Sequence, residues 1–114
     1  MPFATRAVAT KRRAEVRARD GETVCALQIT EECRAEGGFM DYRTRDNRNP
    51  RQFTVDHIIS SEEARQLGWT DAEADSLDNC QGVCRACNRE KSDGLGAVRT
   101  VAPTWVNPRF AHLI

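Results

Sequence analysis

The sequence predicts one small α+β domain. Its 114 residues leave room for a single hydrophobic core, and that core must be modest because only 39% of the residues are hydrophobic. Residues 53–59 alternate in polarity and are rich in β-branched side chains, which is typical of a strand. Cys84 and Cys87 have the spacing at which one short turn directs two thiolates at a tetrahedral metal ion. A strand, several helix signals and a metal clamp therefore define the expected fold.

The first half of the chain is expected to contain short elements joined by polar connections. Residues 5–19 are rich in Ala, Arg and Val and are followed by Gly21, which predicts a mainly polar helix, with a solvated and partly frayed arm as the alternative. The segments that follow are expected to be a short strand at 23–29, a polar loop at 30–38, a second short apolar element at 39–42 and an arginine-rich connection at 43–52.

The second half carries two helix-capping signatures after the predicted strand. At two places a hydroxyl side chain lies three residues before a glutamate, which predicts the first turn of a short helix. The two pairs are Ser60 with Glu63 and Thr70 with Glu73. Residues 79–91 are expected to begin extended and to become helical near Cys87.

Residues 1–114 are expected to form a single domain. Its parts would be a core at about 24–92, an N-terminal helix or arm at 1–20 and an irregular C-terminal tail at 95–114 that wraps the core. No apolar stretch follows Met1, and no run approaches the length of a membrane span. Five cysteines is an odd count that argues against a closed disulfide framework. We therefore expect a cytoplasmic protein in which paired cysteines hold metal.

Two further ligands are needed to close a tetrahedral site around Cys84 and Cys87. The two cysteines that precede the predicted strand are the natural candidates, although the seven residues between them make an unusually wide spacing. We expect a structural zinc ion on Cys25, Cys33, Cys84 and Cys87. Gln28 or an acidic residue near Cys33 is the alternative for the second position. Cys80 stands where an apolar residue would serve and is expected to be a small buried hydrophobe.

Charged side chains are unevenly distributed along the chain. The formal net charge is zero, which gives no overall attraction to nucleic acid or to a membrane. Residues 6–19 nevertheless hold six basic side chains against one glutamate, and residues 43–51 hold four arginines against one aspartate. Residues 62–78 carry six carboxylates against one arginine. This separation predicts a basic face and an acidic face, and clustered cations favour phosphate contact through counterion release.

Asp56 and His57 form an acid–histidine pair at the end of the predicted strand. Neutral imidazole is a suitable general base at physiological pH. Phosphodiester hydrolysis also needs a cation near the leaving oxygen, and a carboxylate with an amide oxygen is a sparse ligand set that suits Mg²⁺. Asn79 and Asn88 supply the available amides. Adjacent strand residues point to opposite faces, so Asp56 and His57 can share one site only if the strand ends or bends there.

Three sequence blocks, taken together, resemble the HNH endonuclease family. The blocks are Asp56-His57-Ile58-Ile59, then Leu77-Asp78-Asn79-Cys80-Gln81, then Cys84-Arg85-Ala86-Cys87-Asn88-Arg89-Glu90-Lys91. Each block alone is a weak signal, whereas the three in this order are specific, and the resemblance covers about residues 24–92. It implies the zinc-stapled ββα-metal (His-Me finger) fold of that family, with flanking helices. Residues 60–76 stand in place of the family's usual turn after the Asp-His motif.

The resemblance implies a role for four polar residues. His57 matches the family's general base, and Asp56 matches the metal ligand that precedes it. Asn79 matches the asparagine that orients the base-bearing loop. Asn88 matches the second metal ligand, where many members have histidine, so the chain resembles the HNN variant.

The expected function is a metal-dependent endonuclease that hydrolyses phosphodiester bonds in DNA, with double-stranded DNA as its partner. The expected cofactors are structural Zn²⁺ and a catalytic divalent cation, Mg²⁺ or Mn²⁺, with Ni²⁺ as a further candidate. Arg85, Arg89 and Lys91 are the expected nucleic-acid contacts. The alternative is a non-catalytic, zinc-stapled module that binds nucleic acid or protein, and a third hypothesis is a nuclease that acts on RNA.

Overall fold

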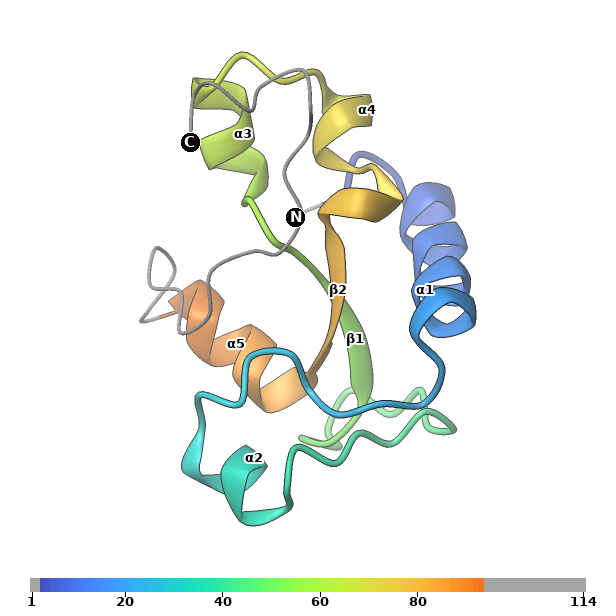
Figure 1. Cartoon of the computed structure of the whole chain (residues 1–114), viewed down its shortest axis with the longest axis vertical. Helices are drawn as coiled ribbons and strands as arrows, with labels where there is room; N and C mark the ends of the chain where they lie inside the picture. The colour runs from blue at the N-terminus through green and yellow to red at the C-terminus, as the bar shows by residue number, and fades with distance from the viewer. Residues whose placement is uncertain (1–2, 94–114) are drawn as a thin grey trace.

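A two-stranded antiparallel sheet lies at the centre of the structure, a computed structural model that describes residues 3–93 (Figure 1). Strand β1 (Phe53–His57) pairs with β2 (Cys80–Cys84). Helix α5 (Arg85–Asp93) begins directly after β2, so the two strands and the helix form one ββα unit. The arrangement confirms the predicted small α+β fold. The predicted tail at 95–114 lies outside the described residues.

Short helical segments surround this unit in the described part of the chain. They are α1 (Arg6–Asp20), α2 (Glu31–Ala35), α3 (Ser61–Gln66), α4 (Asp71–Ala74) and the 3-10 helix η1 (Leu77–Asn79). In Figure 1, α1 lies on one side of the sheet and α5 on the other. The side chains of Ser60 and Thr70 cap α3 and α4, as their sequence predicts. No helix among these is long and apolar enough to cross a membrane.

Two predicted apolar elements do not form strands. Residues 23–29 are irregular, because Ala26 makes a single backbone hydrogen bond to β2 and no regular ladder follows. In the segment at 39–42, Asp41 forms an isolated bridge with Gln52. Both segments instead cover the end of the sheet from which α5 begins.

The loop predicted at 30–38 contains the helix α2. Its N-cap is Thr30, whose hydroxyl accepts a hydrogen bond from the backbone N–H of Cys33, and two glutamates occupy its first turn. These local signals outweigh the polarity of the segment. Helix α5 likewise starts at Arg85, two residues before the expected position.

Two hydrophobic clusters hold the functional elements in place. The larger one joins α1, the sheet and the cysteines, and includes Val16, Phe53 and Val83, each at most 1% exposed. The smaller one lies under α3 and α4 and includes Ile59 and Trp69. The segment that connects β1 to β2 is therefore packed against its own hydrophobic cluster, which holds its backbone in place.

Candidate functional site

The four cysteines predicted as metal ligands come together. They are Cys25 before α2, Cys33 within α2, Cys84 at the end of β2 and Cys87 in the first turn of α5. All four are buried, and their sulfur atoms lie within 4.8 Å of one another. A tetrahedral zinc ion with Zn–S distances of about 2.3 Å separates its sulfur ligands by about 3.8 Å. The cluster therefore fits structural zinc, while Gln28, the alternative ligand, donates to the Cys25 carbonyl oxygen.

Backbone N–H groups point at these sulfur atoms. The amide of Cys84 lies 3.3 Å from Cys25 Sγ, and the amide of Cys87 lies 3.4 Å from Cys84 Sγ. A hydrogen bond from the Cys84 side chain lowers the pKa of Cys25 to about 5, and the same bond raises the pKa of Cys84. Because the thiolate is the form that binds metal, the lowered pKa prepares Cys25 for it, whereas Cys84 would lose its proton only when the metal binds.

Cys80 lies apart from the cluster. It is 1% exposed, and its thiol donates to the carbonyl oxygen of Ser76 at 3.3 Å. Burial raises the pKa of Cys80 to about 12. Because its sulfur lies outside the group of four and its thiol donates to a backbone carbonyl, Cys80 acts as a small buried hydrophobe.

A polar cluster lies between β1 and α5. Thr54 and Asp56 project from the same face of β1, because side chains two residues apart in a strand share a face. Asn88 Nδ2 donates to Thr54 Oγ1 at 3.1 Å. Asp56 Oδ2 accepts from Lys91 Nζ at 2.6 Å and from Gln81 Nε2 at 2.9 Å. The structure thus brings the predicted metal ligands Asp56 and Asn88 to one face.

His57 projects from the opposite face, at the point where β1 ends. It is 2% exposed, its Nε2 lies 2.9 Å from Asp75 Oδ1, and its ring centroid lies 4.3 Å from that of Phe3. Its Nδ1 is buried and has no hydrogen-bond partner among residues 3–93. Its backbone carbonyl accepts from Lys91 Nζ at 2.8 Å, so this lysine connects the His57 backbone with Asp56.

Asn79 fixes the backbone beyond His57. Its side chain is fully buried, and its Oδ1 accepts from the N–H of Ile59 at 2.9 Å. Its Nδ2 donates to the carbonyl oxygens of Ile59 and Ala74 at 2.9 and 2.8 Å. One amide therefore ties the segment after β1 to the end of α4.

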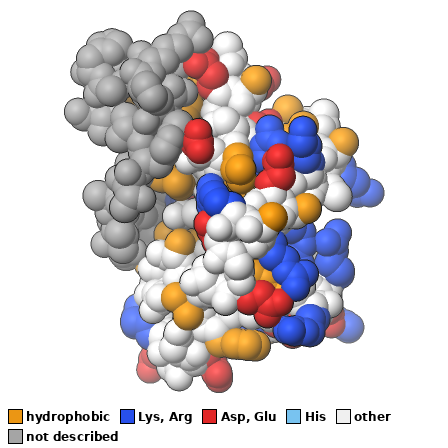
Figure 2. Space-filling view, turned by 45° about the vertical axis from the view of Figure 1, so that its right-hand side comes forward, with side chains coloured by type: hydrophobic (Ala, Val, Ile, Leu, Met, Phe, Trp, Pro, Cys, Tyr) orange, Lys and Arg blue, Asp and Glu red, His pale blue; other side chains and the backbone are white. Residues whose placement is uncertain are grey.

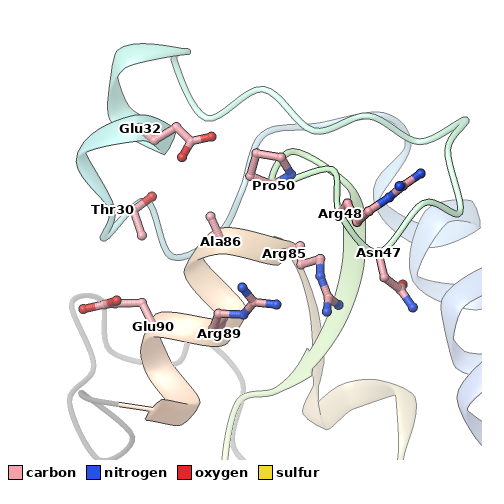
Figure 3. Close-up of a pocket in the computed structure, with 9 residues that line it drawn as sticks. All are labelled: Thr30, Glu32, Asn47, Arg48, Pro50, Arg85, Ala86, Arg89 and Glu90. Carbon is pink, nitrogen blue, oxygen red and sulfur yellow. The ribbon is translucent and has the colours of Figure 1, made fainter.

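An open pocket of about 550 Å³ lies beside the first turns of α5 (Figure 3). Arg85 and Arg89 line it from one side of α5, one turn apart, and Arg48 lines it from the connection before β1. Glu32 and Glu90 also belong to its lining, so the pocket is mixed in charge. Its three arginines make it a candidate contact for a polyanion.

Several basic side chains elsewhere are paired with acids. Figure 2 shows Lys and Arg gathered, with Asp and Glu among them, on the side of the molecule that α1 covers. The ion pairs there include Arg12 with Glu15, Arg17 with Glu22 and Arg19 with Asp20. By contrast, no ion pair of Arg85 or Arg89 is found in the described part of the chain.

A model of the HNH endonuclease family matches residues 31–94, which are more than half of the chain. The chain belongs to the HNH endonuclease family. The match includes both strands, α5 and three of the four clustered cysteines, while α1 and Cys25 precede its first residue. No curated protein and no solved structure matches the chain. The resemblance inferred from the sequence blocks is thereby confirmed, and the HNN variant stays a prediction.

Asp75 is the polar residue of this HNH domain that sequence reasoning did not single out. It is 5% exposed at the end of α4, where Oδ1 meets His57 and Oδ2 accepts from the N–H of Ala4 at 3.1 Å. In the sequence it is one of six carboxylates at 62–78, a pattern typical of a solvated acidic surface. Only the folded chain brings it to a histidine that lies 18 residues away.

His57 gives the fold a defined dependence on pH. Burial lowers the pKa of His57 from its ordinary value of 6.5, although Asp75 acts in the opposite direction. The unfolded chain therefore binds the proton more readily than the folded one, and the contribution of His57 to stability is complete above about pH 6.5. That contribution is lost as the pH falls from this value through the folded pKa.

When the pH is lowered from about 7.5 to about 5.5, we expect the melting temperature of His57→Gln to fall less than that of the wild type. Thermal unfolding of both proteins at the two pH values measures the difference. His112, the other histidine of the chain, is present in both proteins. An equal loss in the two proteins would show that the His57 pKa is not lowered by folding.

Proposed function

We propose that this HNH protein is a metal-dependent endonuclease that hydrolyses phosphodiester bonds in double-stranded DNA. The observation that carries the proposal is the placement of Asp56 and Asn88 on one face of the ββα unit. Asn88 directly follows Cys87, so the cysteine cluster fixes its position. A carboxylate and an amide oxygen are hard ligands that suit Mg²⁺ or Mn²⁺.

Both side chains keep an oxygen for a cation. The two hydrogen bonds that Asp56 accepts use Oδ2 and not Oδ1. Asn88 donates through Nδ2, which leaves its amide oxygen for a ligand bond. When bound, a divalent cation would carry the negative charge that develops on the leaving oxygen. Two protein ligands make a weak site, so the phosphate of the substrate is expected to complete it.

His57 is the proposed general base. If Nε2–H donates to Asp75, the imidazole is held in the tautomer whose Nδ1 accepts a proton. Its lowered pKa keeps the ring neutral at pH 7, as a base requires. Nδ1 then takes the proton from the water that attacks phosphorus. Because Phe3 covers the ring and the ring lies on the face of β1 opposite to Asp56, this step requires Phe3 to move away and the imidazole to turn towards the metal ligands when the substrate binds.

Arg85 and Arg89 are the proposed phosphate contacts. They line the open pocket beside the first turns of α5 (Figure 3). No ion pair of either arginine is found among the described residues. Clustered arginines favour DNA because phosphate binding releases counterions. Lys91, the third expected contact, is 6% exposed and bound to Asp56. Lys91 could contact a phosphate only if it left Asp56, for example when a metal ion bound to that carboxylate.

The alternative function is a zinc-stapled module that binds nucleic acid or protein without chemistry. One observation favours it: Asp56 is neutralised by Lys91, and His57 is buried on the other face of β1. The two functions differ in whether the wild-type protein cleaves DNA at all, and for the nuclease, variants of Asn88 test whether this residue is needed for cleavage.

We expect Asn88→Ala to abolish cleavage while DNA binding is retained, because the metal ion loses one of its two protein ligands. Asn88→His should keep some activity and shift the preference towards Mn²⁺, Ni²⁺ or Co²⁺, since an imidazole nitrogen is a softer ligand. Plasmid cleavage in each metal ion, with a gel-shift measurement of DNA binding, gives both results.

Thr54→Val is the matched control for Asn88→Ala. It removes the hydrogen bond that Asn88 makes to β1, together with the one that Thr54 Oγ1 donates to the carbonyl oxygen of Val83, and it leaves the amide oxygen of Asn88 in place. Both variants should lose roughly 1 kcal/mol of stability for that bond, and only Asn88→Ala should lose cleavage. Unchanged cleavage in Asn88→Ala would remove Asn88 from the site.

A further inference from the structure

Arg51 is a buried cation next to the cysteine cluster. It is 8% exposed and lies two residues before the start of β1, and its Nη2 is 3.1 Å from Cys84 Sγ. Its Nε and Nη1 are buried and have no hydrogen-bond partner among residues 3–93. Its acidic neighbour, Glu32, is 3.8 Å away and half-exposed, which makes a weak ion pair. A buried guanidinium is costly without a strong partner, so another negative charge must explain its position.

A zinc-loaded cluster supplies that charge. Four deprotonated cysteines around one Zn²⁺ carry a net charge of minus two, and all four are buried here. Backbone N–H groups offset part of this charge through hydrogen bonds to sulfur, but they carry no net charge of their own. In a partly dehydrated interior, opposite charges at contact distance attract several times more strongly than in water. A fixed positive charge in contact with the sulfur atoms would therefore stabilise the zinc-loaded cluster most.

We propose that Arg51 is the internal counter-charge of the zinc–thiolate site and raises its affinity for zinc. The guanidinium stays protonated at every physiological pH, and its planar fork presents several donors at once. The backbone of Arg51 is fixed at both of its polar groups. Its N–H donates to Asn49 Oδ1 at 2.9 Å, and its carbonyl accepts from the N–H of Asp41 at 2.6 Å. The charge is thus held in place whether or not the protein cleaves DNA.

The test compares the zinc dissociation constants of three variants with that of the wild type. Arg51→Gln removes the charge and keeps a polar side chain, and Arg51→Lys keeps the charge with fewer donors. Arg45→Gln removes an exposed arginine from the same connection and serves as the control. Competition with a chromophoric chelator gives each constant. We expect Arg51→Gln to bind zinc about 10–100-fold more weakly, the usual effect of losing a partner of a metal ligand. Arg51→Lys should lose less, and Arg45→Gln should match the wild type.

Cobalt substitution distinguishes a weakened site from a lost ligand. The thiolate-to-cobalt absorption should have wild-type intensity in every loaded variant, because none of them removes a cysteine. Wild-type zinc affinity in Arg51→Gln would overturn the proposal. An equal loss in Arg51→Gln and Arg51→Lys would overturn it too, because the effect would then belong to packing. If Arg51→Gln does not fold even with zinc, Arg51→Lys decides alone: retained affinity supports the proposal and lost affinity overturns it.

Discussion

Cys84→Ser is expected to lose the metal and to unfold the domain. Cys84 ends β2 and its sulfur belongs to the ligand cluster, where it also accepts from Arg51. A structural zinc site in a small domain contributes about 10–16 kcal/mol of apparent binding energy, more than a modest core can replace. Elemental analysis of the purified variant and its circular dichroism spectrum measure the two effects.

Cys80→Ala is the control for Cys84→Ser. It removes a buried thiol that lies four residues away and outside the cluster, so it should keep zinc and lose only the stability of one small cavity. A Cys84→Ser protein that is folded without zinc would show that the cluster does not support the fold.

His57→Ala is expected to reduce cleavage by roughly a hundredfold or more, the usual scale for the loss of a general base. It should leave the zinc content unchanged, because the cysteine cluster lies at the other end of the strands. The variant also leaves the Asp75 carboxylate buried without its partner, so its melting temperature is expected to fall. Cleavage must therefore be measured well below the melting transition of the variant.

Phe3→Ala is the matched control for the loss of packing at this position. It removes the ring that covers His57 and leaves the imidazole and Asp75 in place. If His57 is the base, Phe3→Ala keeps or increases cleavage while its stability also falls. Equal cleavage by His57→Ala and the wild type would exclude His57 from the chemistry.

The parts of the fold that the sequence predicts are those with local causes. β1 follows from alternation at 53–59, and α3 and α4 follow from the hydroxyls of Ser60 and Thr70 that cap their first turns. The segment at 23–29 has the composition of a strand, but tertiary packing places it beside the sheet with one backbone bond. The strand expected at 23–29 was therefore wrong, because strand formation there depends on pairing with a neighbouring strand and not on composition alone.

The candidate site divides in the same way. The cysteine cluster was predictable because two ligands share one turn and the others had few competitors. Asp75 was not, because its role depends on a contact between α4 and the end of β1 that no local pattern records. Arg51 carries no sequence signal either, since it is one of four arginines in a connection that favours a solvated surface. Its burial against Cys84 is a property of the folded chain alone.

The most direct test of endonuclease activity uses zinc-loaded wild-type protein, dialysed free of other metal ions, and supercoiled plasmid. Cleavage is expected when Mg²⁺ or Mn²⁺ is added and not before, with the zinc content constant throughout. A parallel reaction on RNA of similar length identifies the preferred substrate. Binding of DNA and RNA without cleavage of either in Mg²⁺, Mn²⁺ or Ni²⁺ would contradict the proposed activity and would favour the non-catalytic binding module.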